Sequence, residues 1–97
     1  MNNQELRIAL AKISDAARAE SKASTAALRA GRYTEFDKNE RPAMRDACSI
    51  DLGNGVSAHA SVGGNSVRQH VRISWKIDGK RASAANAEKL ILEGEGA

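Results

Sequence analysis

The sequence has few of the residues that usually hold a small protein together. It contains one cysteine, one proline and three aromatic residues, and alanine fills 18 positions against 6 leucines, 6 isoleucines and 4 valines. A chain of 97 residues buries a modest fraction of its surface, and aromatic side chains are the usual anchors of a small core. We therefore expect one domain with a thin core, which a homodimer would supplement.

The scarcity of cysteine and of long apolar runs excludes several classes of protein. Cys48 alone cannot form an intramolecular disulfide or a thiolate zinc site, so a cytoplasmic protein without cofactors is expected. The first ten residues lack the basic and apolar segments of a signal peptide. No run of 18 apolar residues occurs, so we expect no membrane span.

The net charge of +3 is unevenly distributed along the chain. Acidic residues gather between positions 33 and 55, whereas positions 56 to 87 hold five basic residues and one acidic residue. Such a surplus favours an anionic partner, which is either a protein with an acidic surface or a nucleic acid.

Residues 1–31 are predicted to form a long helix over positions 3–30. Asn2 or Asn3 can cap its start, and Gly31 suits the left-handed position after its end. The apolar positions recur at three and four residues; they are Leu6, Ala9, Leu10, Ile13, Ala16, Ala17, Ala27 and Leu28. On the opposite side the helix carries a basic ridge, which we define as Arg7, Arg18, Lys22 and Arg29.

Residues 32–43 show no sustained period and are predicted to be a surface connection. They contain the single proline, Pro42, and the acidic residues Glu35 and Glu40, which are expected to be solvated. Tyr33 and Phe36 are expected to pack this connection against the rest of the domain.

From Met44 onward the apolar period changes to two, which predicts a β-meander over residues 44–82. Glycine-rich turns separate three strands and a short fourth, and Trp75 is expected to point inward. Ser83 can cap a helix over residues 83–93, followed by a tail at 94–97. The predicted fold is α+β, with a long N-terminal helix, an antiparallel meander of three to four strands and a short C-terminal helix, and with the helices packed on one sheet face.

Keeping apolar residues on one face predicts the strand pairing. The first hairpin sets Ile50 opposite Ala58 and Leu52 opposite Val56, and the second sets Val62 opposite Val67 and Ala60 opposite Gln69. The outer face then carries cations beside small residues, which is a platform for carboxylates or phosphates. We define this sheet-face set as Arg68, His70, Arg72, Lys76, Lys80 and Arg81, the last two beside the predicted N-terminus of the final helix.

Catalytic and metal chemistry find little support in the sequence. The pairing would make His59 and His70 cross-strand neighbours, but a zinc site needs further ligands and Ser49 is a poor one. Cys48 is expected on the inward face as an inert thiol. We expect no catalytic residue, no metal and no enzymatic activity.

The order of helix, three-stranded meander and helix is similar to that of the double-stranded RNA-binding domain. That resemblance stops at topology, because the first helix is about twice as long and the basic run before the second helix is only Lys80 and Arg81, so its function is not carried over. By size and single-domain build the chain also resembles short accessory proteins of phages and mobile elements, anti-CRISPR inhibitors included. Two functions stay open, a regulator or inhibitor that docks on a protein partner and, as the alternative, a nucleic-acid-binding module.

Overall fold

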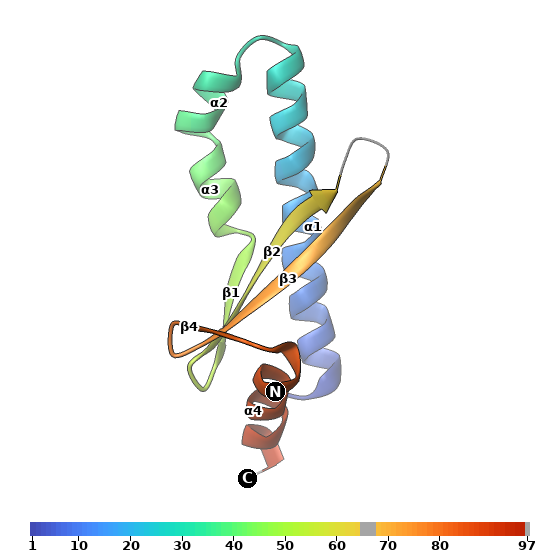
Figure 1. Cartoon of the computed structure of the whole chain (residues 1–97), viewed down its shortest axis with the longest axis vertical. Helices are drawn as coiled ribbons and strands as arrows, with labels where there is room; N and C mark the ends of the chain where they lie inside the picture. The colour runs from blue at the N-terminus through green and yellow to red at the C-terminus, as the bar shows by residue number, and fades with distance from the viewer. Residues whose placement is uncertain (65–67, 97) are drawn as a thin grey trace.

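The computed structural model describes residues 1–64 and 68–96 and has an α+β fold (Figure 1). Its elements in chain order are α1 (Asn3–Arg29), α2 (Tyr33–Asn39), α3 (Arg41–Asp46), β1 (Ser49–Gly53), β2 (Val56–Gly64), β3 (Gln69–Ile77), β4 (Lys80–Ala82) and α4 (Ala84–Gly96). The strands form one antiparallel sheet in the order β1-β2-β3-β4. This confirms the predicted long N-terminal helix, antiparallel meander and short C-terminal helix.

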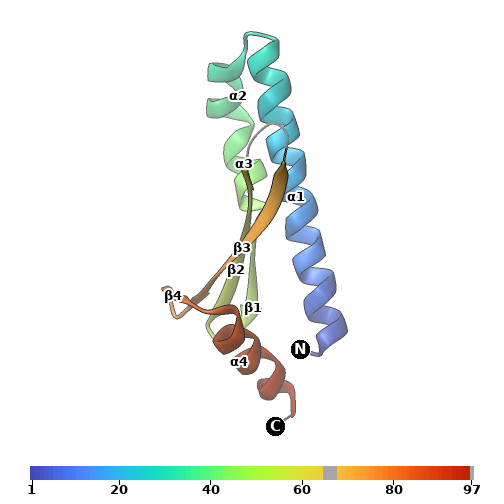
Figure 2. The same cartoon turned by 45° about the vertical axis from the view of Figure 1, so that its right-hand side comes forward.

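The molecule is elongated, with extents of 52 × 27 × 22 Å. Figures 1 and 2 show α1 running along one side of the sheet and continuing past its end, where α2 and α3 return alongside its C-terminal half. Helix α4 lies at the opposite end of the molecule, near the N-terminus.

Helix α1 begins and ends at the expected signals. The side chain of Asn2 accepts a hydrogen bond from the Glu5 N–H at 2.8 Å, which satisfies one of the free amides of the first turn. After the last turn Gly31 adopts φ +73°, and the Arg32 N–H bonds to the carbonyl of Ala27 at 2.9 Å. These bonds form a glycine-terminated cap that satisfies carbonyls of the last turn.

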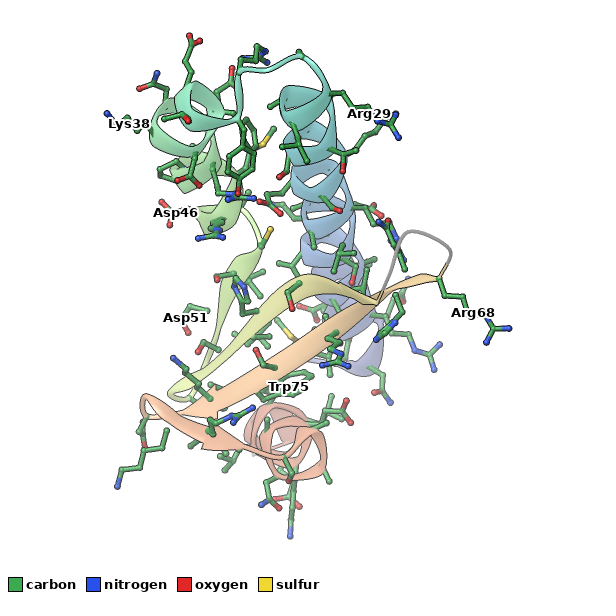
Figure 3. The ribbon with its side chains drawn as sticks, turned by 45° about the horizontal axis from the view of Figure 1, so that its top comes forward. Arg29, Lys38, Asp46, Asp51, Arg68 and Trp75 are labelled. Atoms are coloured by element: carbon green, nitrogen blue, oxygen red, sulfur yellow. The ribbon has the colours of Figure 1, made fainter. Side chains whose placement is uncertain are left out.

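The core lies between α1, one face of the sheet and α4. Ile13 of α1, Val56 of β2 and Ile91 of α4 are fully buried in one cluster, and Trp75 of β3 is 6% exposed, as expected. Figure 3 shows Trp75 between β3 and α4. Much of the remaining contact is made by small residues of α1 and β2, which are Ala9, Ala17, Ala58 and Ala60.

Part of the predicted apolar stripe of α1 is not buried. Leu28 is 66% exposed, whereas its neighbour Ala27 is fully buried. The sheet has ended at this level of α1, so the last turn packs only on the side that faces α2 and α3 (Figure 1).

The expected connection over residues 32–43 is not irregular, because these residues form α2 and the first half of α3. Met44, predicted to start the meander, lies in α3, and β1 starts at Ser49. Helices of seven and six residues are too short to show an apolar period. Pro42 stands in the first turn of α3, where a backbone N–H would have no carbonyl partner within the helix. The lack of an N–H in proline therefore costs no hydrogen bond there.

Arg41 holds these two short helices on α1. Its guanidinium donates hydrogen bonds to Glu20 Oε1 at 2.9 Å, to Ser24 Oγ at 2.9 Å, to Tyr33 Oη at 2.6 Å and to Asp37 Oδ1 at 2.7 Å. The guanidinium carbon also lies 5.1 Å from the ring centroid of Tyr33. The hydrogen bonds that Arg41 donates to Tyr33, Asp37 and Glu20 raise its pKa further, so its charge is permanent.

The first hairpin pairs almost as predicted. Ile50 lies opposite Ala58, but Gly53 rather than Leu52 lies opposite Val56, because the register shifts between Asp51 and Gly53. The shift is a bulge beside the turn, and it leaves Leu52 on the buried face.

The predicted pairing of the second hairpin is wrong by four residues. Val62 lies opposite Val71 and Ala60 opposite Ile73, while the expected partner Val67 is outside the described residues. The displacement is even, so every side chain stays on its predicted face. The observed register pairs β2 and β3 over nine residues each, whereas the predicted one would have carried Trp75 and Ile77 beyond the end of β2.

We predict that Trp75→Ala destabilises the protein by about 3 to 5 kcal/mol, because it removes the largest side chain of the core. The matched control is Ile8→Ala in α1. Ile8 is 62% exposed, so this substitution should change stability by less than about 0.5 kcal/mol. Urea unfolding followed by circular dichroism measures both. Equal midpoints for the two variants would contradict the inward position of Trp75.

We also predict that Arg41→Met lowers the free energy of unfolding by about 2 kcal/mol, because it leaves Glu20 and Asp37 without their charged donor. Arg32→Met is the control, since Arg32 meets Glu40 at 3.7 Å with both side chains about half exposed. Amide hydrogen exchange should show α2 and α3 opening in Arg41→Met while the sheet stays protected. Uniform protection in both variants would show that the cluster is not what holds these helices.

Candidate functional site

The sheet-face set is spread along β3 and β4. Lys76 lies between Ser57 and Arg81 on the neighbouring strands. Arg72 lies opposite Ser61, on the same face as Lys76 and four residues before it. Arg68 extends outward where β3 begins (Figure 3), about 30 Å from the β3–β4 turn by strand geometry. The cations therefore follow the length of β3 rather than converging on one point.

The predicted pairing of the two histidines is also wrong. His59 lies opposite Ser74 and exchanges a hydrogen bond with Ser49 Oγ at 2.6 Å. His70 lies opposite Gly63 and accepts a hydrogen bond from Arg72 Nε at 3.2 Å. The four-residue displacement of β3 separates the rings along the strand. In the described part of the chain, no three His, Cys, Asp or Glu side chains come close enough to hold a metal ion.

At the predicted anion site before α4, one amide of the helix N-terminus already has a partner within the chain. The Ser83 hydroxyl accepts a hydrogen bond from the Asn86 N–H at 3.2 Å, as a helix cap does. Lys80 and Arg81 lie in β4 and are exposed. Arg81 pairs with Lys76 and extends the positive charge of the outer face, whereas Lys80 pairs with Ile77 and so lies on the opposite face.

Cys48 is a buried thiol at the junction of α3 and β1. It is 3% exposed, and its sulfur lies 3.2 Å from the Met44 carbonyl, to which it donates. Burial raises the pKa of the thiol above its ordinary value, and the charge of Glu20 adds to this effect. A raised pKa lowers the thiolate fraction at neutral pH, so Cys48 is a poor nucleophile and a poor metal ligand.

A groove of about 570 Å³ lies between the C-terminal half of α1 and the end of the β2–β3 hairpin. Three cations of the basic ridge border it, and its remaining lining comes from small or polar residues of α1 and from the two strands. The lining residues are Arg18, Ser21, Lys22, Thr25, Ala26, Arg29, Val62, Gln69, His70 and Val71. We call this feature the basic groove.

The basic groove joins the two surfaces that the sequence offered as alternatives. Arg18, Lys22 and Arg29 come from the ridge, and His70 comes from the sheet-face set. Arg7 lies more than two turns before Arg18 on α1 and takes no part. Sequence reasoning missed this junction because only the observed register brings the start of β3 opposite the end of β2, beside α1.

The charges at the groove are available for a ligand. Arg18 pairs with Asp15 at 3.2 Å, but both side chains are more than 60% exposed, so this pair contributes little. Within the described residues, Lys22 and Arg29 have no carboxylate partner. Beside these cations lie the methyl groups of Ala26, Val62 and Val71. An apolar floor with a cationic rim suits an anionic ligand that also has apolar side chains.

The alanine face of α1 is not free for a symmetry mate. Four small residues of α1 could let a second copy approach, but Ala9 and Ala27 are buried within the chain, and Ala16 and Ala23 are partly buried. Helix α1 uses its small residues to approach β2 and α3 closely. A homodimer formed by packing α1 on α1 through these alanines would therefore require the domain to open.

No helix among residues 1–64 and 68–96 combines the length and the hydropathy needed to cross a bilayer. No known protein family, curated protein or solved structure matches this chain.

We predict that native Cys48 reacts with iodoacetamide at least about tenfold more slowly at pH 8 than the same thiol in urea, because its burial keeps the thiol protonated and inaccessible. An exposed control is Ala19→Cys in a Cys48→Ala background. The labelling rate of that control should level off about one pH unit above the ordinary thiol pKa of about 8.5, because the thiol is then almost fully ionised. The rate for Cys48 should still rise there, because its pKa is raised; identical pH profiles would contradict this.

Proposed function

We propose that this protein is a non-enzymatic binding protein, a regulator or inhibitor that docks on a protein partner through the basic groove. The observation that carries the proposal is the meeting of Arg18, Lys22 and Arg29 with the apolar side chains of Val62 and Val71 in one groove. A partner segment with acidic and apolar residues matches both parts of this surface.

The mixed lining favours a protein partner over a nucleic acid. A surface for single-stranded nucleic acid uses exposed aromatic side chains for stacking, but Trp75 and Phe36 are buried, and Tyr33 is engaged by Arg41 at the far side of α1. A duplex binder needs cations spaced along the phosphate backbone. The ridge from Arg7 to Arg29 spans about 33 Å and is the surface that such a binder would use, so a nucleic-acid-binding module is the alternative outcome of the test below.

Two further parts of the proposal concern where and how the protein acts. An unpaired, buried Cys48 suits the reducing cytoplasm. A regulator of this size would act by occupying its partner's surface, as the short accessory proteins of phages and mobile elements do, anti-CRISPR inhibitors among them.

The test is affinity capture by the tagged protein from a lysate of the organism that encodes it, with and without nuclease. We predict that Arg18→Glu/Lys22→Glu lowers the captured partner at least about tenfold, because it reverses two charges at the groove. Lys12→Glu/Lys89→Glu makes the same change in net charge away from the groove and should capture as the unchanged protein does. Circular dichroism confirms that both variants fold.

Three outcomes would contradict the proposal. If the captured complex disappears with nuclease and its affinity falls steeply with salt, the nucleic-acid alternative holds. If the control variant loses the partner equally, the effect is one of net charge. If neither variant loses it, the groove is a solvated face.

A further inference from the structure

Strand β3 has an open edge that the sheet leaves unpaired. On one side β3 pairs with β2 over its whole length. On the other side β4 covers only Trp75, Lys76 and Ile77. In the described chain, no strand pairs with residues 69–74 on that side. Figure 1 shows this half of β3 crossing in front of α1 with its outer edge uncovered.

The odd-numbered residues of β3 direct their backbone groups at the open edge. The Asp78 N–H bonds to the carbonyl of Gly55 at 2.8 Å, so the even-numbered residues of β3 face β2. Backbone direction alternates along an antiparallel strand, so the odd-numbered residues face the β4 side. Val71 and Ile73 therefore present N–H and C=O groups there without a strand partner in the described residues. Their side chains, partly buried, lie on the core face.

In one symmetric register, the side chains along this edge disfavour a second copy of the chain. In a symmetric antiparallel pair centred on Arg72, that residue would stand directly opposite its own copy, and like charges in this position are destabilising. Charged residues on an edge strand are a common means of preventing self-association. An acidic residue in the same place would instead form a cross-strand ion pair with Arg72.

The open edge is continuous with the basic groove. Gln69, His70 and Val71 belong to both. A strand laid along the edge would reach the groove at one end, where Lys22 and Arg29 of α1 lie, and would meet β4 at the other.

We propose that the partner adds an extended acidic strand to the open edge of β3, antiparallel to β3 and in line with β4. Its apolar residues lie beside Val71 and Ile73, and its acidic residues lie beside Arg72 on the outer face. This proposal rests on the proposed function and specifies its partner as an extended segment of alternating acidic and apolar residues, bound by strand addition.

The probe is the acetylated and amidated peptide Val-Glu-Val-Glu-Val-Glu-Val, mixed with the full chain. With its valines on the core face, its valine N–H groups point at β3 and its glutamate N–H groups point away. A peptide N-methylated at the valines should bind at least about tenfold more weakly, because it loses several backbone hydrogen bonds. The same peptide N-methylated at the glutamates is the matched control and should bind as the unmethylated one does.

Amide hydrogen exchange observed by NMR locates the bound strand. The amides of Val71 and Ile73 should exchange rapidly in the free protein and slow at least about tenfold with saturating peptide. The amides of Arg72 and Ser74 face β2 and serve as internal controls. Arg72→Glu should weaken binding of the glutamate peptide and favour the peptide with lysine in place of glutamate, whereas Arg81→Glu, in β4, should do neither.

Three other outcomes would each overturn strand addition. The capture experiment tests separately whether the basic groove binds the partner. If the unmethylated peptide and both N-methylated peptides bind alike, and if their binding depends on Arg18 and Lys22, the groove binds acidic segments by side-chain contacts alone. If no peptide slows Val71 and Ile73, the edge is not a binding surface. If these amides become protected as the concentration of the protein alone rises, a second copy occupies the edge.

Discussion

The close approach of α1 to β2 is the constraint on which the rest of the molecule depends. With few large apolar residues available, the core brings the helix and the strand together through Ala9, Ala17, Ala58 and Ala60, and Ile13 and Val56 fill the space beside them. Small side chains give up buried area but let backbones pack near one another. This fixes the axis of α1 against the sheet, and every other element adjusts to it.

A mismatch of lengths follows from that contact. Helix α1 has 27 residues and is about 40 Å long, whereas the nine residues of β2 extend about 30 Å. The C-terminal turns of α1 therefore project beyond the sheet. One side of this projection is covered by α2 and α3, held by Arg41 with hydrogen bonds where apolar residues are scarce. On the other side, the described residues leave these turns largely exposed, and the turns form a wall of the basic groove.

The sequence was sufficient to predict the features that depend on local pattern. The cap at Asn2, the glycine after α1, the alternation of the strands and the inward position of Trp75 each follow from residues close in the chain. The pairing of β2 with β3 was predicted in its faces but not in its register, because a displacement by four residues preserves the alternation. Total paired length and the burial of Trp75 decide between such registers, and neither can be read from a two-residue period.

The features missed in the sequence are tertiary. Arg41 looks like any charged residue in a polar stretch until its partners at positions 20 and 24 are placed beside it. The basic groove likewise requires α1 and the hairpin end to meet, which depends on the register that the pattern leaves open.

The register of β3 shows how its cations are spaced along the open edge. Spread along an exposed edge, Arg72 and its neighbours do not concentrate enough charge in one place to hold a compact anion. The same spacing does match the period of an extended strand, in which every second side chain lies on the outer face. An edge that carries Arg72 on its outer face, and on which no strand of the described residues pairs with the Val71 and Ile73 backbone, would discriminate between partners by their charge pattern. A protein with a thin core can therefore still carry a binding surface that selects its partners by their charge pattern.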